Sequence, residues 1–433
     1  MSTILNLLGL LFSIYVFWFI LTPRMVSRRL VASYNNPGGR YYMNPVMAFG
    51  VFTICSGPLF LGQFSLFKYG FYFIMLIYMI FSGKIRPVAS GAVLAYSLFM
   101  AWIAFDANYS GAVYDASMLL IKYIMPLFTL WLGYSALECR DDFYNLCKAI
   151  AKCSFWYALL IGGLSAKFTP WLYFSSFGQM FLTYAGLADY FTAICGVTLV
   201  LYVLTNEKKW LFYLGWMLLS TILESVRTGL GGLAMTVSVF YLLRYKLKAI
   251  PVVILIVGIF VGTILFVPEV GEKFFGDNAA TMTASDVTNS SLDDMNTNGR
   301  GELWDLVMYL FYEPNQLTGA GTGTVSQFMK ERSVQESTIA LLHSDYVQIL
   351  CDNGDIGLYL WISFYVVSIL SVMGKVWTTG NEWVRLSGSL AVGSFAGIAL
   401  AMGFDNVVSH SMSSLIIPFF FLGVYYKMKE IQS

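Results

Sequence analysis

Long apolar segments separated by short polar breaks make up most of this 433-residue chain. Runs of about 18 to 22 apolar residues recur, which is the pattern of helices that cross a bilayer. Alternating segments of about ten residues, which typify membrane β-barrels, do not occur. The pattern predicts an all-α polytopic membrane protein with 12 to 13 transmembrane helices. The predicted spans lie near residues 4–22, 42–62, 69–83, 88–106, 117–136, 149–165, 183–205, 210–225, 229–243, 249–267, 354–373, 386–404 and 412–426.

The basic residues predict how these spans are oriented. Lys and Arg gather in every second loop, for example at Arg28 and Arg29 after the first span, whereas the loop from Asp106 to Asp115 has none. Because cytoplasmic loops carry an excess of Lys and Arg, we expect a cytoplasmic C-terminus and an external segment 268–353. In a bacterium, this orientation places the chain in the inner membrane with that segment in the periplasm or at the cell surface.

The composition agrees with a membrane protein. Only 12% of residues are charged and mean hydropathy is +0.67, whereas soluble domains are about 25% charged. A net charge of +1 without a basic tract predicts no nucleic-acid partner. The six cysteines match neither a disulfide framework nor a zinc pattern, so no metal or cofactor is expected. The first apolar run, Ile4 to Leu21, lacks a basic n-region and a cleavage motif, and we interpret it as a retained span.

The external segment 268–353 separates an N-terminal transmembrane bundle (1–267) from C-terminal transmembrane helices (354–433). Between Pro268 and Leu342 it carries eleven acidic and four basic residues, a net charge of −7. It opens with a stretch that is rich in Thr, Ser, Asn and Asp, and such polar composition predicts mobility. That stretch covers residues 278–298.

The second half of the external segment predicts local structure. Apolar residues recur at helical spacing from Gly301 to Tyr312, which indicates an amphipathic helix on top of the bundle or on the membrane surface. Pro314 is expected to end this helix. The sequence LTGAGTGTV then predicts a tight turn region that uses three glycines, Gly319, Gly321 and Gly323.

Arg227 lies in TILESVRTGLGGLAMTV, with apolar sequence on both sides, near the predicted external face. An arginine inside a membrane is costly, so a functional role is the first interpretation. The Arg-Thr-Gly turn would also present backbone donors to an anion. The alternative is an interfacial arginine that pairs with Glu224 one helical turn earlier.

Arg300 stands immediately before the predicted helix that starts at Gly301. Glu302 and Asp305 suit the positive end of the helix dipole, whereas Arg300 opposes it. That placement fits an arginine kept for an anionic ligand. A solvated loop arginine is the alternative, and the residues alone leave both interpretations open.

The chain has two histidines, and both lie on the predicted external side. His343 precedes a span and is a candidate general base, because neutral histidine commonly takes this role near pH 7. A structural role near a helix end is the alternative, and Asp345 is expected to face elsewhere on the helix. His410, beside Asp405, is a second candidate or an interfacial residue. Asp189, near the external end of its span, could bind sugar hydroxyls or a cation.

Motifs for nucleotide binding and for common hydrolases are absent: there is no P-loop, GxGxxG, HExxH or GxSxG. A D-x-D site for nucleotide sugars is absent as well. An external site without a nucleotide signature is expected to use an activated substrate that arrives with the membrane.

Several short sequences in the second half of the chain resemble the O-antigen polymerase and O-antigen ligase superfamily. HSDYVQILCDNGDIGLYLW is similar to the family pattern of a His, a small polar residue, an acidic residue and G-x-x-G entering a span. ESVRTGLGGL, NGRGELW and LTGAGTGTVSQF resemble, in the same order, its arginine-led span start, its loop helix and its glycine-rich turn. The first half of the chain matches only as a bundle of many spans.

The resemblance implies an activity and roles for three residues. The family acts on glycans carried by undecaprenyl pyrophosphate at the periplasmic face, as a metal-independent, inverting glycosyltransferase. By this resemblance, Arg227 and Arg300 would bind the donor pyrophosphate and His343 would be the catalytic base. A flippase and a chain-length regulator of the same pathway are the implied protein partners.

Four functions stay open at this point. The acidic external segment favours a polymerase of O-antigen, capsule or exopolysaccharide. A ligase, which would receive the phosphate-rich core attached to lipid A, should favour a basic external surface. A lipid-linked glycan transporter or flippase would place cationic residues along a central cavity, and Arg227 is the clearest basic residue within an apolar run. A non-catalytic assembly partner would need neither the arginines nor His343.

Overall fold

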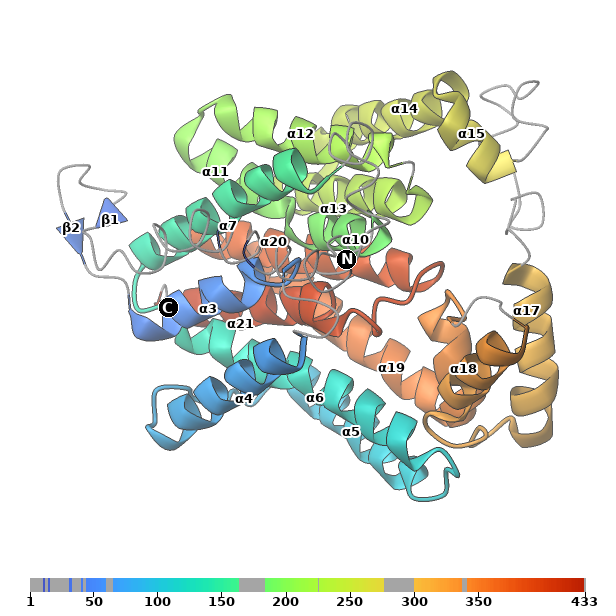
Figure 1. The fold of residues 1–433 in the computed structure, drawn as a ribbon. Coiled ribbons are helices and arrows are strands. Elements are labelled where there is room, and N and C mark those ends of the chain that lie inside the picture. The colour runs from blue at the N-terminus through green and yellow to red at the C-terminus, as the bar shows by residue number, and fades with distance from the viewer. Residues whose placement is uncertain are drawn as a thin grey trace.

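A computed structural model shows an almost entirely helical chain (Figure 1). Its strands are the two-residue antiparallel pair β1 (Val31–Ala32) and β2 (Arg40–Tyr41). The all-α class predicted from the sequence is confirmed. The stretch 278–298, predicted to be mobile, lies outside the described part of the chain, as does most of the first predicted span. The structure describes residues 11, 15, 31–32, 40–41, 44–59, 65–162, 184–224, 226–275, 300–336 and 341–431.

Within the described residues, every predicted span from residue 42 onward overlaps a helix. Five helical segments of the described chain are long and apolar enough to cross a membrane, and shorter apolar helices accompany them. The 11-residue α3 is about 17 Å long, short of the roughly 30 Å of a hydrocarbon core, so the predicted count of 12 to 13 spans stays a prediction. The helices are α3 (Pro45–Cys55), α4 (Ser65–Phe81), α5 (Gly91–Ala107), α6 (Val113–Ser135), α7 (Arg140–Leu160), α10 (Tyr184–Ile194), α11 (Gly196–Thr205), α12 (Lys209–Leu223), α13 (Arg227–Tyr245), α14 (Ile250–Phe266), α19 (Asp345–Thr378), α20 (Glu382–Met402) and α21 (Ile416–Ile431).

Small residues let the central helices approach one another closely. α13 packs along α20, and α6 packs along α21. A Cβ added at Gly397 of α20 would meet the side chains of Thr236 and Thr192, and one added at Gly423 of α21 would meet the backbone of α6. Small residues at helix contacts are typical of membrane bundles, where van der Waals packing and not water exclusion joins the helices.

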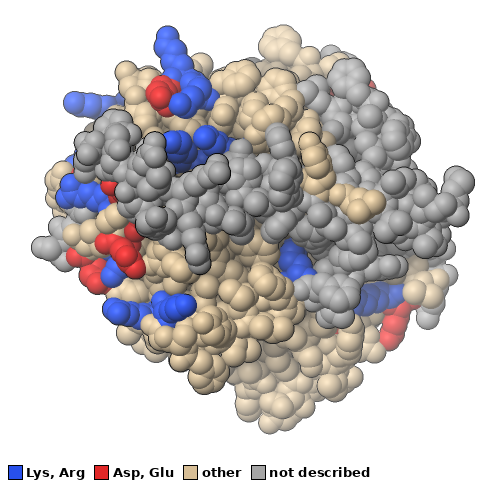
Figure 2. Space-filling view, turned by 60° about the vertical axis from the view of Figure 1, so that its left-hand side comes forward, with Lys and Arg blue, Asp and Glu red and all other residues tan. Residues whose placement is uncertain are grey.

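The outer helices turn apolar side chains away from the bundle. α14 follows α13 through the short 3₁₀ helix η4 (Lys246–Ala249), and of its residues only Ile264 is buried. Ile254 and Leu255 are well exposed, which would be unfavourable in water and suits contact with lipid. Figure 2 shows Lys and Arg gathered toward one edge of the view, beside a broad uncharged surface of described residues.

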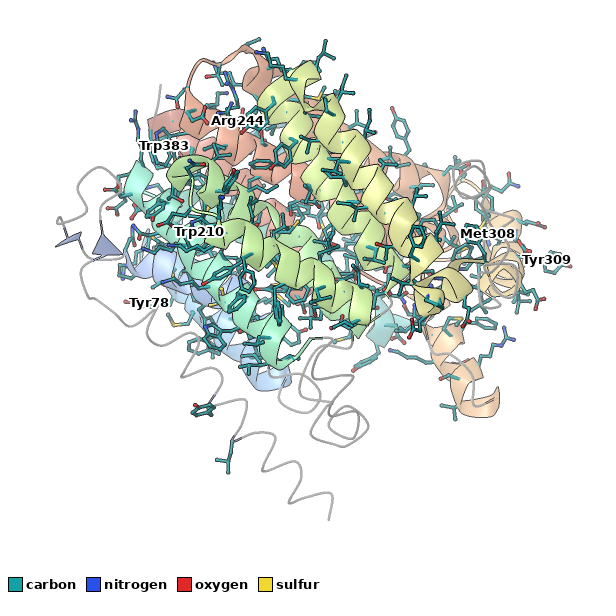
Figure 3. The ribbon with its side chains drawn as sticks, turned by 90° about the horizontal axis from the view of Figure 1, so that it is seen from above. Tyr78, Trp210, Arg244, Met308, Tyr309 and Trp383 are labelled. Atoms are coloured by element: carbon teal, nitrogen blue, oxygen red, sulfur yellow. The ribbon has the colours of Figure 1, made fainter. Side chains whose placement is uncertain are left out.

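The two ends of the bundle differ. Arg244 at the end of α13 forms an ion pair with Glu382 at the start of α20, so two loops predicted to be cytoplasmic lie together. Figure 3 shows Arg244 and Trp383 at one end of the molecule and Met308 and Tyr309, from the predicted external segment, at the other. This separation is consistent with the predicted orientation; which end faces the cytoplasm stays a prediction.

In the described part of segment 268–353, short helices cap one end of the bundle (Figure 1). The predicted amphipathic helix is present, as an α-helical turn that continues into π-helix, and Pro314 lies in the 3₁₀ turn that closes it. Val307 of this helix packs with Val325 and Met329 of α18. The segment contains α15 (Pro268–Phe275), α17 (Arg300–Val307), the π-helix η6 (Met308–Tyr312), η7 (Glu313–Asn315) and α18 (Thr324–Glu336).

The predicted glycine turn is confirmed and is fastened to α19. Gly319, Gly321 and Gly323 have φ of +77°, +104° and +90°, which favour glycine. Asp352 of α19 accepts hydrogen bonds from the backbone N–H of Gly323 (3.1 Å) and of Val325 (2.9 Å). The turn is therefore held against the part of α19 that precedes its kink.

α19 is kinked at Gly354, where φ is +65° and ψ is −168°. A Cβ at this position would meet the backbone of Leu317 and Gly319. Asn353 donates to Asp106 of α5 (2.7 Å) and to Thr322 (2.6 Å). The kink divides α19 into a short section, which follows His343 and is bonded to the glycine turn, and a longer apolar section.

We expect Gly354→Ala to destabilise the fold by about 1–3 kcal/mol, because a side chain at positive φ is strained and would press on a neighbouring turn. Thermal unfolding of the purified protein in detergent, followed by tryptophan fluorescence, measures this loss. Gly374→Ala in the same helix is the control: its Cβ would point into open space, so the unfolding temperature should stay the same or rise. Equal unfolding temperatures for both variants would contradict the role of Gly354.

Candidate functional site

His343 lies just before α19 in a conformation that needs support. Its φ is +58°, in the left-handed region that non-glycine residues rarely adopt. Its backbone N–H donates to the Asn406 side-chain oxygen (3.0 Å), in the loop between α20 and the 3₁₀ helix η8 (Ser411–Ser413). A strained residue that its neighbours hold in place is a feature of functional sites.

The His343 ring faces two side chains of the same loop. Its Nδ1 lies 3.1 Å from Asn406 Nδ2 and 3.4 Å from Asp405 Oδ1. When Nδ1 carries a proton it can donate to Asp405, which leaves Nε2 free to accept a proton. When Nδ1 is unprotonated it can accept from Asn406. The loop can therefore accommodate both forms of the ring.

Asp405 is suited to stabilise a charged His343. Burial on its own acts to raise the pKa of Asp405, but hydrogen bonds from His343 and from the Asn406 N–H, together with the charges of both histidines, outweigh it. The pKa of Asp405 therefore lies below its ordinary value. An ionised carboxylate beside Nδ1 favours an imidazolium, as in other acid–base sites.

Arg300 begins α17 and reaches the same loop. Its Nη1 donates to the backbone oxygen of Phe404 (2.9 Å), the residue before Asp405. Burial lowers the pKa of Arg300, while the nearby charge of Asp405 acts to raise it. The guanidinium has thus given up part of its hydration, and a bound anion would compensate for that loss.

Arg227, at the start of α13, lies close enough to Arg300 for their positive charges to repel. The two residues are far apart in sequence, so the fold brings two cations together at the end of the bundle that is predicted to be external. The alternative pairing of Arg227 with Glu224 is not formed: Glu224 Oε1 accepts from Ser220 (3.2 Å), and its buried Oε2 has no partner in the described chain. Two neighbouring guanidiniums are a suitable arrangement for a pyrophosphate.

Further hydrogen bonds hold these elements in register. Trp304 of α17 donates its Nε1–H to the backbone oxygen of Leu342 (2.8 Å), next to His343. Asp345 accepts from the Val408 N–H (3.1 Å), which agrees with the expectation that it faces away from the His343 ring. α17, the start of α19 and the 404–408 loop are therefore joined independently of any ligand.

The two secondary candidates are placed differently. Asp189 in α10 is fully buried, and both its carboxylate oxygens lack a hydrogen-bond partner among the described residues. The charges of Asp405 and Asp345 act on it, so it lies beneath the site; contact with a sugar or a cation stays a prediction. His410 belongs to the same loop as Asp405, and burial lowers its pKa.

The sequence did not single out Asp405 and Asn406 as site residues. Both stand in GFDNVVSHSM, a polar break between two spans on the same predicted face as His343. Their place on the same predicted face as His343 was the sequence signal that could have assigned them to the site. Their contact with His343, more than 60 positions away, is made by the packing of α19 against α20.

A family model described as O-antigen ligase matches residues 212–362. This match confirms the predicted resemblance to the O-antigen polymerase and ligase superfamily over a stretch that contains Arg227, Arg300 and His343. No curated protein matches the chain. The apolar helices indicate a membrane protein, which over these residues is similar to the O-antigen ligase family.

Proposed function

We propose that this protein polymerises glycan repeat units carried on a lipid pyrophosphate, at the external face of the bacterial inner membrane. One observation carries the proposal: the 404–406 loop contacts both Arg300, through the Phe404 carbonyl, and His343, through Asp405 and Asn406. The 404–406 loop thus positions both a cation for the leaving pyrophosphate and a base for the attacking hydroxyl.

The proposed reaction uses these groups as follows. The acceptor hydroxyl gives its proton to Nε2 of His343, and its oxygen attacks the anomeric carbon with inversion. The bond between that carbon and the pyrophosphate oxygen breaks, and the electron pair leaves with the lipid pyrophosphate. Arg227 and Arg300 neutralise the charge that the leaving group gains, and Asp405 stabilises the imidazolium.

The proposed carrier is undecaprenyl pyrophosphate, and the proposed step requires no metal. The lipid tail would lie along the apolar bundle while the pyrophosphate reaches the arginines at its external end. A flippase and a chain-length regulator remain the proposed protein partners. The product could be O-antigen, capsule or exopolysaccharide, because the residues of the site contact the pyrophosphate and the attacking hydroxyl, which all three have in common.

A ligase is the second candidate, because the matching family model is described as O-antigen ligase. The two activities share donor chemistry and differ in the acceptor. The net charge of −7 between Pro268 and Leu342 favours an acceptor other than the phosphate-rich lipid A core, so we place the polymerase first.

We expect His343→Ala to abolish polymerisation, because removal of a general base typically costs about 10²–10⁴-fold in rate. The glycan ladder of cells that express the variant measures this, with the amount of protein in the membrane fraction checked alongside. Single repeat units should accumulate while the variant is inserted normally. Glu313→Gln, an exposed change in the helical cap at the same end of the bundle, is the control and should leave the ladder unchanged.

Other outcomes identify other functions. If long polymer forms but is not attached to the lipid A core, the protein is a ligase. If lipid-linked repeats accumulate only on the cytoplasmic face, it is a transporter. A normal ladder in the His343→Ala strain would show that His343 is structural and that the proposed mechanism is wrong.

A further inference from the structure

A cavity of about 140 Å³ lies between α6, α18 and the start of α19. By the volume of liquid water this corresponds to about five water molecules, which is roughly the space of one sugar ring. Neither Arg227 nor Arg300 lines it. Its polar lining consists mainly of Asp115, Lys122, Ser326, Lys330, Gln348 and Asn406.

The cavity adjoins His343 through Asn406. The same Asn406 side chain lines the cavity, accepts from the His343 N–H (3.0 Å) and lies 3.1 Å from the ring Nδ1. Leu342, the residue before His343, is also part of the lining. A molecule in the cavity would therefore contact the residues that hold the proposed base, at a place separate from the arginines.

One lysine in the wall of the cavity, Lys122, has no direct partner for its ammonium within the described chain. Lys330 forms an ion pair with Asp115. Lys122 is half-buried, and within the described chain its ammonium makes no hydrogen bond or ion pair, although the charges of Asp345, Lys330 and Asp115 act on it. A half-buried ammonium without a partner is unfavourable, so an anionic group in the cavity would be stabilising.

The remaining lining suits a sugar. Gln348 donates to Ser326 (2.8 Å), and both side chains keep further hydrogen-bonding capacity for hydroxyl groups. At the rim, the exposed Tyr114 ring lies under the Lys330 ammonium (5.6 Å) and offers an aromatic face. Small-molecule sites are usually lined by apolar side chains with a few polar groups among them.

We propose that this cavity holds the terminal sugar of the acceptor glycan, with an acidic substituent of that sugar paired with Lys122. The bound sugar would present its attacking hydroxyl to His343, while the donor pyrophosphate occupies the arginines. This inference rests on the proposed polymerase function and adds its acceptor site. The chemical class of the acceptor end is a sugar with one acidic substituent, such as a carboxylate, whose charge Lys122 alone can neutralise; the phosphate-rich lipid A core carries more negative charge than that.

The test uses the full chain in lipid nanodiscs and a defined probe. The probe is the oligosaccharide repeat unit of the host, released from its carrier by mild acid and labelled at its reducing end, so that it can act only as an acceptor. Fluorescence anisotropy gives its Kd, and transfer from lipid-linked donor gives KM and kcat. The variants are Lys122→Gln and Lys122→Arg, with the exposed residue change Lys375→Gln as control.

We expect Lys122→Gln to raise both Kd and KM for the probe about tenfold, with kcat within about twofold, because it removes one charge-assisted contact. Lys122→Arg should retain binding, and Lys375→Gln should resemble wild type. Reduction of the probe's carboxylates should weaken binding to wild type but not to Lys122→Gln. Unchanged Kd and KM in Lys122→Gln, or no effect of carboxylate reduction, would overturn the proposal.

The outcomes separate this inference from the proposed function. Binding of the probe that depends on Lys122, without any transfer by wild type, supports the cavity and contradicts the polymerase. Transfer that is independent of Lys122 supports the polymerase and contradicts the cavity as the acceptor site.

Discussion

The candidate site depends on the hydrogen bonds of three consecutive residues, Phe404, Asp405 and Asn406. The Phe404 carbonyl holds Arg300, and the two side chains hold the backbone and ring of His343. Arg300 and His343 come from separate elements, and one short loop fixes both. Because buried polar groups without partners are costly, these hydrogen bonds also hold the loop against Arg300 of α17 and against His343 before α19.

Further hydrogen bonds join the described residues around that loop. Asp352 and Asn353 connect the glycine turn to α19, and Trp304 connects α17 to the residue before His343. The kink at Gly354 separates the start of α19, which follows His343, from the rest of the helix. Most polar side chains named here therefore form hydrogen bonds within the protein, and few are left to bind a ligand.

Much of the fold could be predicted from the sequence, because the spacing of apolar residues and the backbone conformations that favour glycine are local signals. The helix after Arg300, the turn of Gly319 to Gly323 and the spans from residue 42 onward follow from such signals. Asp405 and Asn406 could not be assigned to the site, since their role arises from the packing of α20 beside α19. Likewise, local spacing left a Glu224–Arg227 pair open as an alternative, whereas tertiary packing gives Glu224 a serine partner and brings Arg227 near Arg300.

In the proposed mechanism, the arginines bind the donor pyrophosphate and His343 acts only in the reaction. Titration of the purified protein with undecaprenyl pyrophosphate separates these two roles. Arg300→Gln should weaken binding about tenfold or more, whereas His343→Gln should bind within about twofold of wild type and should not turn over. Equal affinity of Arg300→Gln and wild type would show that Arg300 does not hold the donor.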